Sequence, residues 1–238
     1  MPKIEERDRA LAYGIRLHRR LVGHKYLLLT LPLVLLLVLY PYLEETGGGM
    51  LALKIISSAT LVTAVYAVSE RRGPLYFAIF LAVPAIGIGW SDYFIQAPAL
   101  ALAEGLSSIL LYSFTTLAIF GSILRGRLTD DMIFGAVAIY LLMGITWANA
   151  YAVAATVSPD AFLVGHGGGA GGATVFSDFL YFSFITLATV GYGDITPLLA
   201  PVRSLAYLEA VAGSLFMAVF IARLIGALAS NHGGRDGE

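Results

Sequence analysis

The stretch Thr189-Val190-Gly191-Tyr192-Gly193-Asp194 decides what this chain builds. It stands between a short apolar segment, Phe176 to Ala188, and a long apolar run, Val202 to Ala229. A cation that has lost its water needs oxygen ligands, and backbone carbonyls supply them when successive peptides point the same way. Such a backbone requires angles that most residues avoid, whereas glycine takes positive φ at little steric cost. Glycine at alternate positions therefore predicts a loop that can take such angles, and a simple glycine turn is the alternative.

The residues of this loop have distinct expected tasks. We expect Gly191 and Gly193 to take the positive φ angles, and Thr189 to offer its hydroxyl as well as its carbonyl. The side chains of Val190 and Tyr192 are then expected to point away from the ion path and to brace the loop. Asp194 is expected to place a carboxylate at the outer mouth.

The string resembles the selectivity filter of tetrameric potassium channels, which is the standard example of ion selectivity by carbonyl oxygens. The resemblance extends over about residues 129–230, and the earlier half of the chain resembles the six-span members only in layout. It implies potassium ions bound at Thr189, Val190, Gly191 and Tyr192, with Gly193 completing the filter. Because the string occurs once, several chains must share one pore, and the resemblance implies a homotetramer.

Composition indicates a membrane protein. The 238 residues have a mean hydropathy of +0.79, and 58% are hydrophobic while 13% are charged. The net charge of −1 suggests no nucleic-acid partner, and the lack of Cys excludes disulfides and thiolate metal sites. No nucleophile–base pair, phosphate loop or metal cluster is evident, so we expect no enzyme activity and no cofactor other than potassium ions in the filter.

Six apolar segments each approach the roughly 20 residues that cross the hydrocarbon core. They are residues 26–43, 50–69, 74–92, 98–124, 130–157 and 201–229. The predicted fold class is an all-α membrane protein, with six transmembrane helices plus a re-entrant pore helix and filter loop.

The predicted domains follow from these segments. Residues 26–128 form a four-helix transmembrane domain in the position of a voltage sensor, and residues 129–230 form the pore domain. Residues 1–25 are either an amphipathic helix at the cytoplasmic surface or a solvated tail. Residues 231–238 are expected to be a cytoplasmic tail too short to fold into a ligand-gating domain.

The distribution of basic residues predicts the orientation in the membrane. With a cytoplasmic amino terminus, all of the 15 Lys and Arg except Lys54 and Arg203 lie at or near the inner face. This predicts a multi-pass protein of the cell membrane, with both termini cytoplasmic and the filter at the outer face. The Gly-rich residues 158–174 are expected to form a flexible outer turret before the pore helix.

Around the filter we expect a supporting shell. The pore helix should begin near residues 175–178, with Ser177 as N-cap and Asp178 in its first turn. An aromatic cuff around Tyr192 is expected from Phe179, Tyr181, Phe182 and Phe184. Some relatives carry a Glu at the position of Ile185, paired with the Asp equivalent to Asp194; here that pair is absent.

The sixth span offers candidates for a gate. Gly213 stands where inner helices of this family often bend, although a close contact between small residues would equally require it. The residues Phe216, Phe220 and Leu224 recur every four positions and would narrow the inner mouth. Glu209 is ionisable within a span, so we expect it to pair near the base of the pore helix or to line an aqueous path.

The fourth span predicts weak voltage dependence. A voltage sensor needs several basic residues along one membrane helix, and residues 98–124 contain none. Their only ionisable residue is Glu104, for which Lys54 is a candidate partner. Candidates for proton control are Glu104, Glu209, His18 and His24.

Four alternatives to a potassium-selective channel stay open: a non-selective cation channel, a channel subunit regulated by protons or membrane lipids, a signalling protein on the same scaffold, and a secondary transporter. Tyr192 argues against the first, because non-selective relatives commonly lose it. A transporter would show internal repeats, which the sequence lacks.

Overall fold

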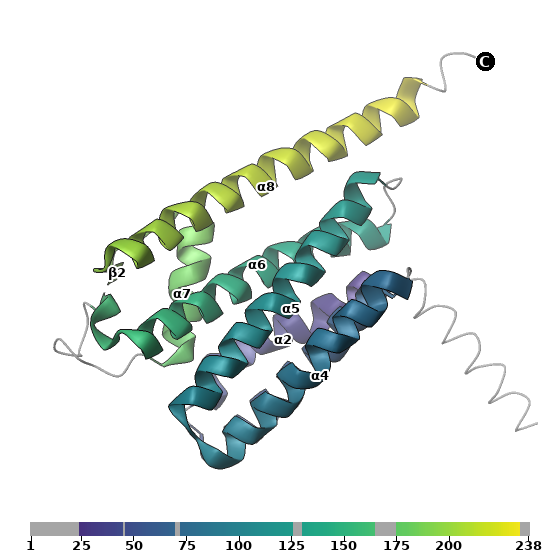
Figure 1. Cartoon of the computed structure of the whole chain (residues 1–238). Coiled ribbons are helices and arrows are strands. Elements are labelled where there is room, and N and C mark those ends of the chain that lie inside the picture. Colours follow the sequence, from purple (N-terminus) through teal and green to yellow (C-terminus); the bar gives the residue numbers. More distant parts are fainter. Residues whose placement is uncertain (1–23, 45, 70–71, 126–129, 165–174, 234–238) are drawn as a thin grey trace, which may run out of the picture.

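The computed structural model describes residues 24–44, 46–69, 72–125, 130–164 and 175–233 (Figure 1). Within these ranges, six helices are long and apolar enough to cross a membrane. They are α2 (Lys25–Leu43), α3 (Gly49–Ala67), α4 (Arg72–Ile95), α5 (Pro98–Arg125), α6 (Asp130–Val157) and α8 (Ala200–Gly233). The predicted all-α membrane fold is confirmed. Residues 1–23 with His18, most of the expected turret and residues 234–238 lie outside the described ranges.

Helices α2 to α5 form one bundle, and α6 packs against two of its helices, α2 and α5. The short helix α7 (Phe176–Leu187) lies between α6 and α8, which runs along the side of the molecule opposite α4 (Figure 1). Within one chain, 56% of the most apolar window of α6 is buried, against 17% of that of α8. Helix α6 is therefore the centre of the chain, while α8 presents an apolar face that the chain itself does not cover.

Several hydroxyls inside the spans find a partner in their own helix, whereas those of Thr115 and Thr116 on α5 have none among the described residues. The hydroxyls of Thr30, Thr60 and Thr146 each donate to the carbonyl four residues earlier, at 2.6–2.9 Å. In a helix surrounded by lipid and apolar neighbours, a hydroxyl without such a partner would be costly. Thr30 also lies 3.1 Å from the carbonyl of Phe134 and so joins α2 to α6.

The start of α2 is held by the start of α6. The carboxylate of Asp131 accepts hydrogen bonds from the amides of Tyr26 at 3.2 Å and Leu27 at 3.4 Å. These amides belong to the first turn of α2, which has no partners for them within the helix. The four-helix part and the predicted pore part are thus joined within one chain. The predicted boundary between them falls at residues 126–129, outside the described ranges.

The segment after α6 is more ordered than a flexible turret. A 3-10 turn (η1, Pro159–Ala161) leads into the strand β1 (Phe162–Val164), which pairs antiparallel with β2 (Ile195–Pro197). The register places Phe162 opposite Pro197 and Val164 opposite Ile195. The expectation of a flexible turret does not hold for residues 159–164, because the apolar residues of β1 pair with β2, some 30 residues further along the chain. The sheet holds the chain where it leaves the filter.

Candidate functional site

Two carboxylates hold the beginning of the pore helix α7. Glu44, just beyond α2, accepts hydrogen bonds from the amides of Phe176 at 2.9 Å and Ser177 at 3.1 Å. Asp178 accepts one from the amide of Val175 at 3.3 Å. Burial raises the pKa of Asp178, the Val175 amide lowers it, and the charge of Glu44 raises it. Asp178 lies in the first turn of α7, as predicted. The prediction of Ser177 as N-cap was wrong, because Val175 is the N-cap. The carboxylate of Glu44 accepts the hydrogen bonds that a capping side chain would otherwise accept.

Sequence reasoning missed Glu44. Its only signal was a carboxylate directly after an apolar span, which normally indicates no more than a membrane boundary. The ring of Tyr40, one helical turn earlier, packs on that of Phe176 with centroids 4.9 Å apart. The end of α2 therefore touches the start of α7, the helix that precedes the string 189–193.

The carboxyl end of α7 organises the loop that follows. The carbonyl of Ile185 accepts hydrogen bonds from the amides of Val190 at 2.8 Å and Gly191 at 3.2 Å. Thr189 donates its amide to the carbonyl of Thr186 at 2.9 Å. Ile185 thus holds the start of the string 189–193 through its backbone carbonyl. Because the negative end of the α7 dipole points toward this region, it favours a cation there.

Positive φ angles occur at every second residue of the filter string. Thr189 has φ +57°, Gly191 +54° and Gly193 +80°, while Val190 and Tyr192 stay in the ordinary negative region. The sign of φ therefore alternates along the string, as a loop with successive peptides turned the same way requires. The glycines take the angles expected of them; the positive φ of Thr189 was not expected, since a β-branched residue rarely adopts it.

The filter string is uncovered within one chain. Residues 188–193 are all exposed, with Val190 at 52% and Tyr192 at 72%. A Cβ added to Gly191 or Gly193 would meet nothing within 4 Å. A strained backbone persists only where surrounding structure holds it. The uncovered face of this loop is therefore where further contacts are to be expected.

Tyr181 and Asp194, both predicted to support the filter, lie together. The Tyr181 hydroxyl donates to the Asp194 carboxylate at 2.7 Å. This hydrogen bond is the main cause that raises the pKa of Tyr181 to about 12. The contact ties α7 to the residue that follows the string 189–193.

The expected aromatic cuff does not form around Tyr192 within one chain. Phe182 packs on Tyr151 at 4.9 Å and on Phe162 at 5.6 Å between ring centroids, and Phe179 packs on Phe162 at 5.3 Å. No ring contact to Tyr192 is found in the described ranges. These rings share a face of α7 that the chain buries against its own α6 and β1, which is why they turn away from the filter.

Two glycines let the neighbouring helices approach α7 closely. A Cβ on Gly213 of α8 would collide with the backbone carbonyl oxygen of Leu187, and one on Gly144 of α6 would collide with the ring of Phe184. Helix α8 is continuous through Gly213. Close packing against the end of the pore helix therefore accounts for Gly213 without a bend.

Glu209 pairs with hydroxyls behind the pore helix. Its carboxyl oxygens lie 2.5 Å from the hydroxyl of Tyr151 on α6 and 2.5 Å from that of Ser183 on α7. All three side chains are fully buried. Of the two expected places for Glu209, the contact with the pore helix is the one observed.

A cavity of about 640 Å³ lies below the filter between α6 and α8. Its lining includes Thr189, Gly213, Phe216 and Phe220, so three predicted gate residues share a cavity with the first filter residue. Phe216 is nevertheless buried, packing on Phe120 of α5 and Tyr140 of α6. The fourth predicted gate residue, Leu224, has a side chain outside the described ranges.

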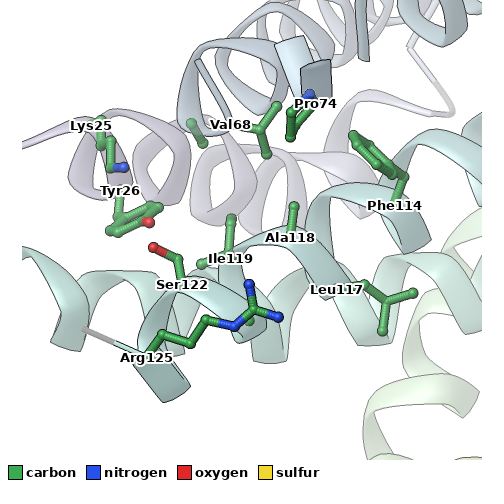
Figure 2. A pocket seen from close by; sticks show the side chains of 12 residues that line it. Lys25, Tyr26, Val68, Pro74, Phe114, Leu117, Ala118, Ile119, Ser122 and Arg125 are labelled. Atoms are coloured by element: carbon green, nitrogen blue, oxygen red, sulfur yellow. The ribbon is translucent and has the colours of Figure 1, made fainter. Parts of the chain in front are cut away.

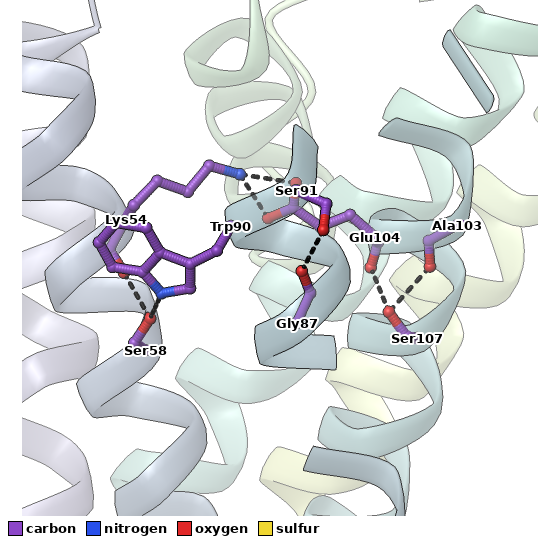
Figure 3. Close-up of polar contacts among 8 residues, drawn as sticks. All are labelled: Lys54, Ser58, Gly87, Trp90, Ser91, Ala103, Glu104 and Ser107. Carbon is purple, nitrogen blue, oxygen red and sulfur yellow. Dashed lines mark hydrogen bonds and ion pairs between the residues drawn. The ribbon is translucent and has the colours of Figure 1, made fainter. Parts of the chain in front are cut away.

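The predicted pair of Lys54 and Glu104 is confirmed (Figure 3). The Lys54 ammonium lies 2.6 and 2.7 Å from the two carboxylate oxygens, and both side chains are largely buried. Beside it, the indole of Trp90 donates to the hydroxyl of Ser58 at 3.1 Å. The pair balances the charge of Glu104 and ties α3 to α5.

A second cavity of about 640 Å³ opens at the other end of the four-helix part (Figure 2). Lys25 of α2 and Arg125 of α5 lie at it, together with apolar side chains such as Val68, Pro74 and Phe114. Basic residues thus gather at one end of the bundle, opposite the end that carries Glu44 and contacts the start of α7.

Residues 132–230, which contain most of α6, all of α7, the filter string and most of α8, match a protein-family model described as ion channel. Comparisons with curated proteins and with solved structures give no match. The match coincides with the part of the chain that carries the alternating φ angles, and it indicates an ion channel.

Proposed function

We propose that this chain is the subunit of a homotetrameric, potassium-selective channel that conducts passively through its filter string. The observation that carries the proposal is the alternation of φ from Thr189 to Gly193. We infer from it a row of carbonyls on one side of the loop, which is the arrangement that replaces the hydration shell of a dehydrated cation. One loop supplies only part of such a shell.

The uncovered surfaces support a tetramer. The filter string is exposed, and α8 buries little of its apolar length within the chain. Copies arranged around an axis beside α8 would cover both surfaces and complete the ring of carbonyls. The cavity below Thr189 would then open toward the axis.

The charge distribution supports an orientation in the cell membrane. Lys25 and Arg125 lie at one end of the bundle, and the positive-inside rule assigns that end to the cytoplasm. The filter then faces outward, with both chain ends inside. Because α5 carries no basic residue before Arg125, we propose conduction with little voltage dependence.

Reversal potentials in liposome-derived bilayers test the proposal. Purified protein should pass potassium and exclude sodium, and Gly191→Ala should abolish or strongly reduce this selectivity, because alanine strains at φ +54°. The matched control is Gly47→Ala, where an added Cβ also meets nothing within 4 Å but φ is not positive. Equal sodium and potassium permeability in the unaltered protein would instead establish a non-selective cation channel, and native mass spectrometry measures the subunit number.

A further inference from the structure

The hydroxyl of Ser183 stands at the centre of a buried junction of three helices. It lies 2.7 Å from the carbonyl oxygen of Gly144 on α6 and 2.5 Å from a carboxyl oxygen of Glu209 on α8. The other carboxyl oxygen of Glu209 accepts from the hydroxyl of Tyr151, also at 2.5 Å. Tyr151, Ser183 and Glu209 are each 0% exposed.

Counting protons decides the charge of Glu209. The cluster has three short oxygen–oxygen contacts, each of which needs one proton between its oxygens. The hydroxyls of Tyr151 and Ser183 each have one proton to donate. The carbonyl of Gly144 has none, so the third proton must reside on the carboxyl of Glu209.

With that proton present, the junction is fully satisfied. The acid O–H of Glu209 donates to Ser183, Ser183 donates to the Gly144 carbonyl, and Tyr151 donates to the remaining carboxyl oxygen. An ionised Glu209 would leave two oxygens facing each other without a proton. In the described ranges no Lys, Arg or His forms an ion pair with it, and an uncompensated charge at this depth is costly.

We infer that Glu209 holds a proton and, as a neutral acid, ties the inner helix α8 to the pore helix α7. The tie is close to the filter. Ser183 lies two residues before Ile185, whose carbonyl accepts hydrogen bonds from the amides of Val190 and Gly191. One helical turn beyond Glu209, Gly213 packs against the end of α7 at Leu187. Glu209 is thus a positioning residue for the filter, a role that rests on the proposed function, whereas its protonation does not.

Infrared difference spectroscopy tests the protonation directly. In a detergent without ester groups at neutral pH, the spectrum of the full chain minus that of the Glu209→Gln variant should contain the C=O stretching band of a protonated carboxyl. Tyr151→Phe should shift this band to higher frequency, because the C=O oxygen loses the hydrogen bond from the tyrosine hydroxyl. A carboxylate band in place of the acid band would overturn the inference.

Flux measurements test the positioning role. Glu209→Leu should lose most of the potassium flux, and Glu209→Gln should restore it, because an amide can donate to Ser183 and accept from Tyr151 as the neutral acid does. Should the leucine variant fail to fold, Ser183→Ala should weaken flux while the acid band of Glu209 persists. Unchanged selectivity and flux in both Glu209→Leu and Ser183→Ala would overturn the positioning role.

The two proposals fail in different ways. An acid band together with equal sodium and potassium permeability would leave the protonation standing and remove the proposed function. Potassium selectivity together with a carboxylate band would do the reverse.

Discussion

Two acidic side chains within the spans are stabilised in opposite ways. In the four-helix part, Glu104 forms an ion pair with Lys54 that joins α3 to α5. At the junction of α6, α7 and α8, Glu209 has no cationic partner among the described residues and sits among hydroxyls. The comparison teaches that an apolar environment accepts a carboxyl group either with a counter-charge or with a proton. The counter-charge at Glu104 gives an ion pair away from the filter string. The proton on Glu209 leaves no charge next to the pore helix.

The same two regions differ in how tightly their backbones approach. At the pore junction Gly213 faces the backbone carbonyl of Leu187, which cannot move without moving the end of the pore helix. In the four-helix part Gly89 faces the carboxylate tip of Glu104, 2.9 Å from where a Cβ would lie, and a side-chain tip can shift. The pore side is therefore expected to tolerate less change than the four-helix side.

The largest effect is expected from Gly213→Ala. The added methyl group would displace Leu187, and overpacking of this kind costs on the order of 1–3 kcal/mol. Because Leu187 lies two residues before Thr189, potassium flux should also be lost. Gly89→Ala should have a smaller effect, and Gly226→Ala on the same helix, where a Cβ meets nothing within 4 Å, should have none. Equal flux in all three variants would remove the distinction between the regions.

A substitution of glutamate by glutamine should separate the two carboxyl groups. Glu104→Gln leaves the buried ammonium of Lys54 without a counter-charge and should destabilise the protein by about 1–3 kcal/mol in thermal unfolding. Replacing both partners, as Lys54→Met with Glu104→Leu, should recover much of the loss. Glu209→Gln should cost clearly less than Glu104→Gln. A larger loss of stability in Glu209→Gln than in Glu104→Gln would mean that Glu209 is ionised.

Glu44→Gln should weaken the link between the two regions. The carboxylate accepts from two amides at the positive end of α7, and its loss should cost about 0.5–1 kcal/mol. Protection of the protein by potassium against heat reports on the filter and should decrease. The control is Asp160→Asn, an exposed carboxylate in the outer turn. An equal decrease in both variants would show a general charge effect and not a cap.

The smallest effect is expected from membrane voltage. The ion pair of Lys54 and Glu104 has no net charge, and α5 has no basic residue before Arg125. Conductance in symmetric potassium should therefore change little with voltage. A steep sigmoid equivalent to several gating charges would show that the four-helix part moves charge after all.

Local patterns were sufficient for the spans, the pore helix and the glycine angles of the filter. The pair of Lys54 and Glu104 was also predictable, because two opposite charges at similar depth in neighbouring spans have few other partners. The N-cap of α7 was not. The preference for serine at helix N-termini favours Ser177 as the cap. The amide of Ser177 instead donates to the carboxylate of Glu44, 133 residues away. The orientation of Phe179 and Phe182 was not predictable either, because the packing of α7 on α6 and β1 decides which way these rings point.

By itself the sequence determined six helices long and apolar enough to cross a membrane, and a loop with positive φ at Gly191 and Gly193. These properties depend on hydropathy over about 20 residues and on where glycine stands, and both are local. Only the tertiary structure decided that Glu44 holds the pore helix, that β1 pairs with β2, and that Glu209 meets Tyr151 and Ser183. Each of these contacts joins separate elements, so it depends on the angle and depth at which they pack, which no single segment specifies.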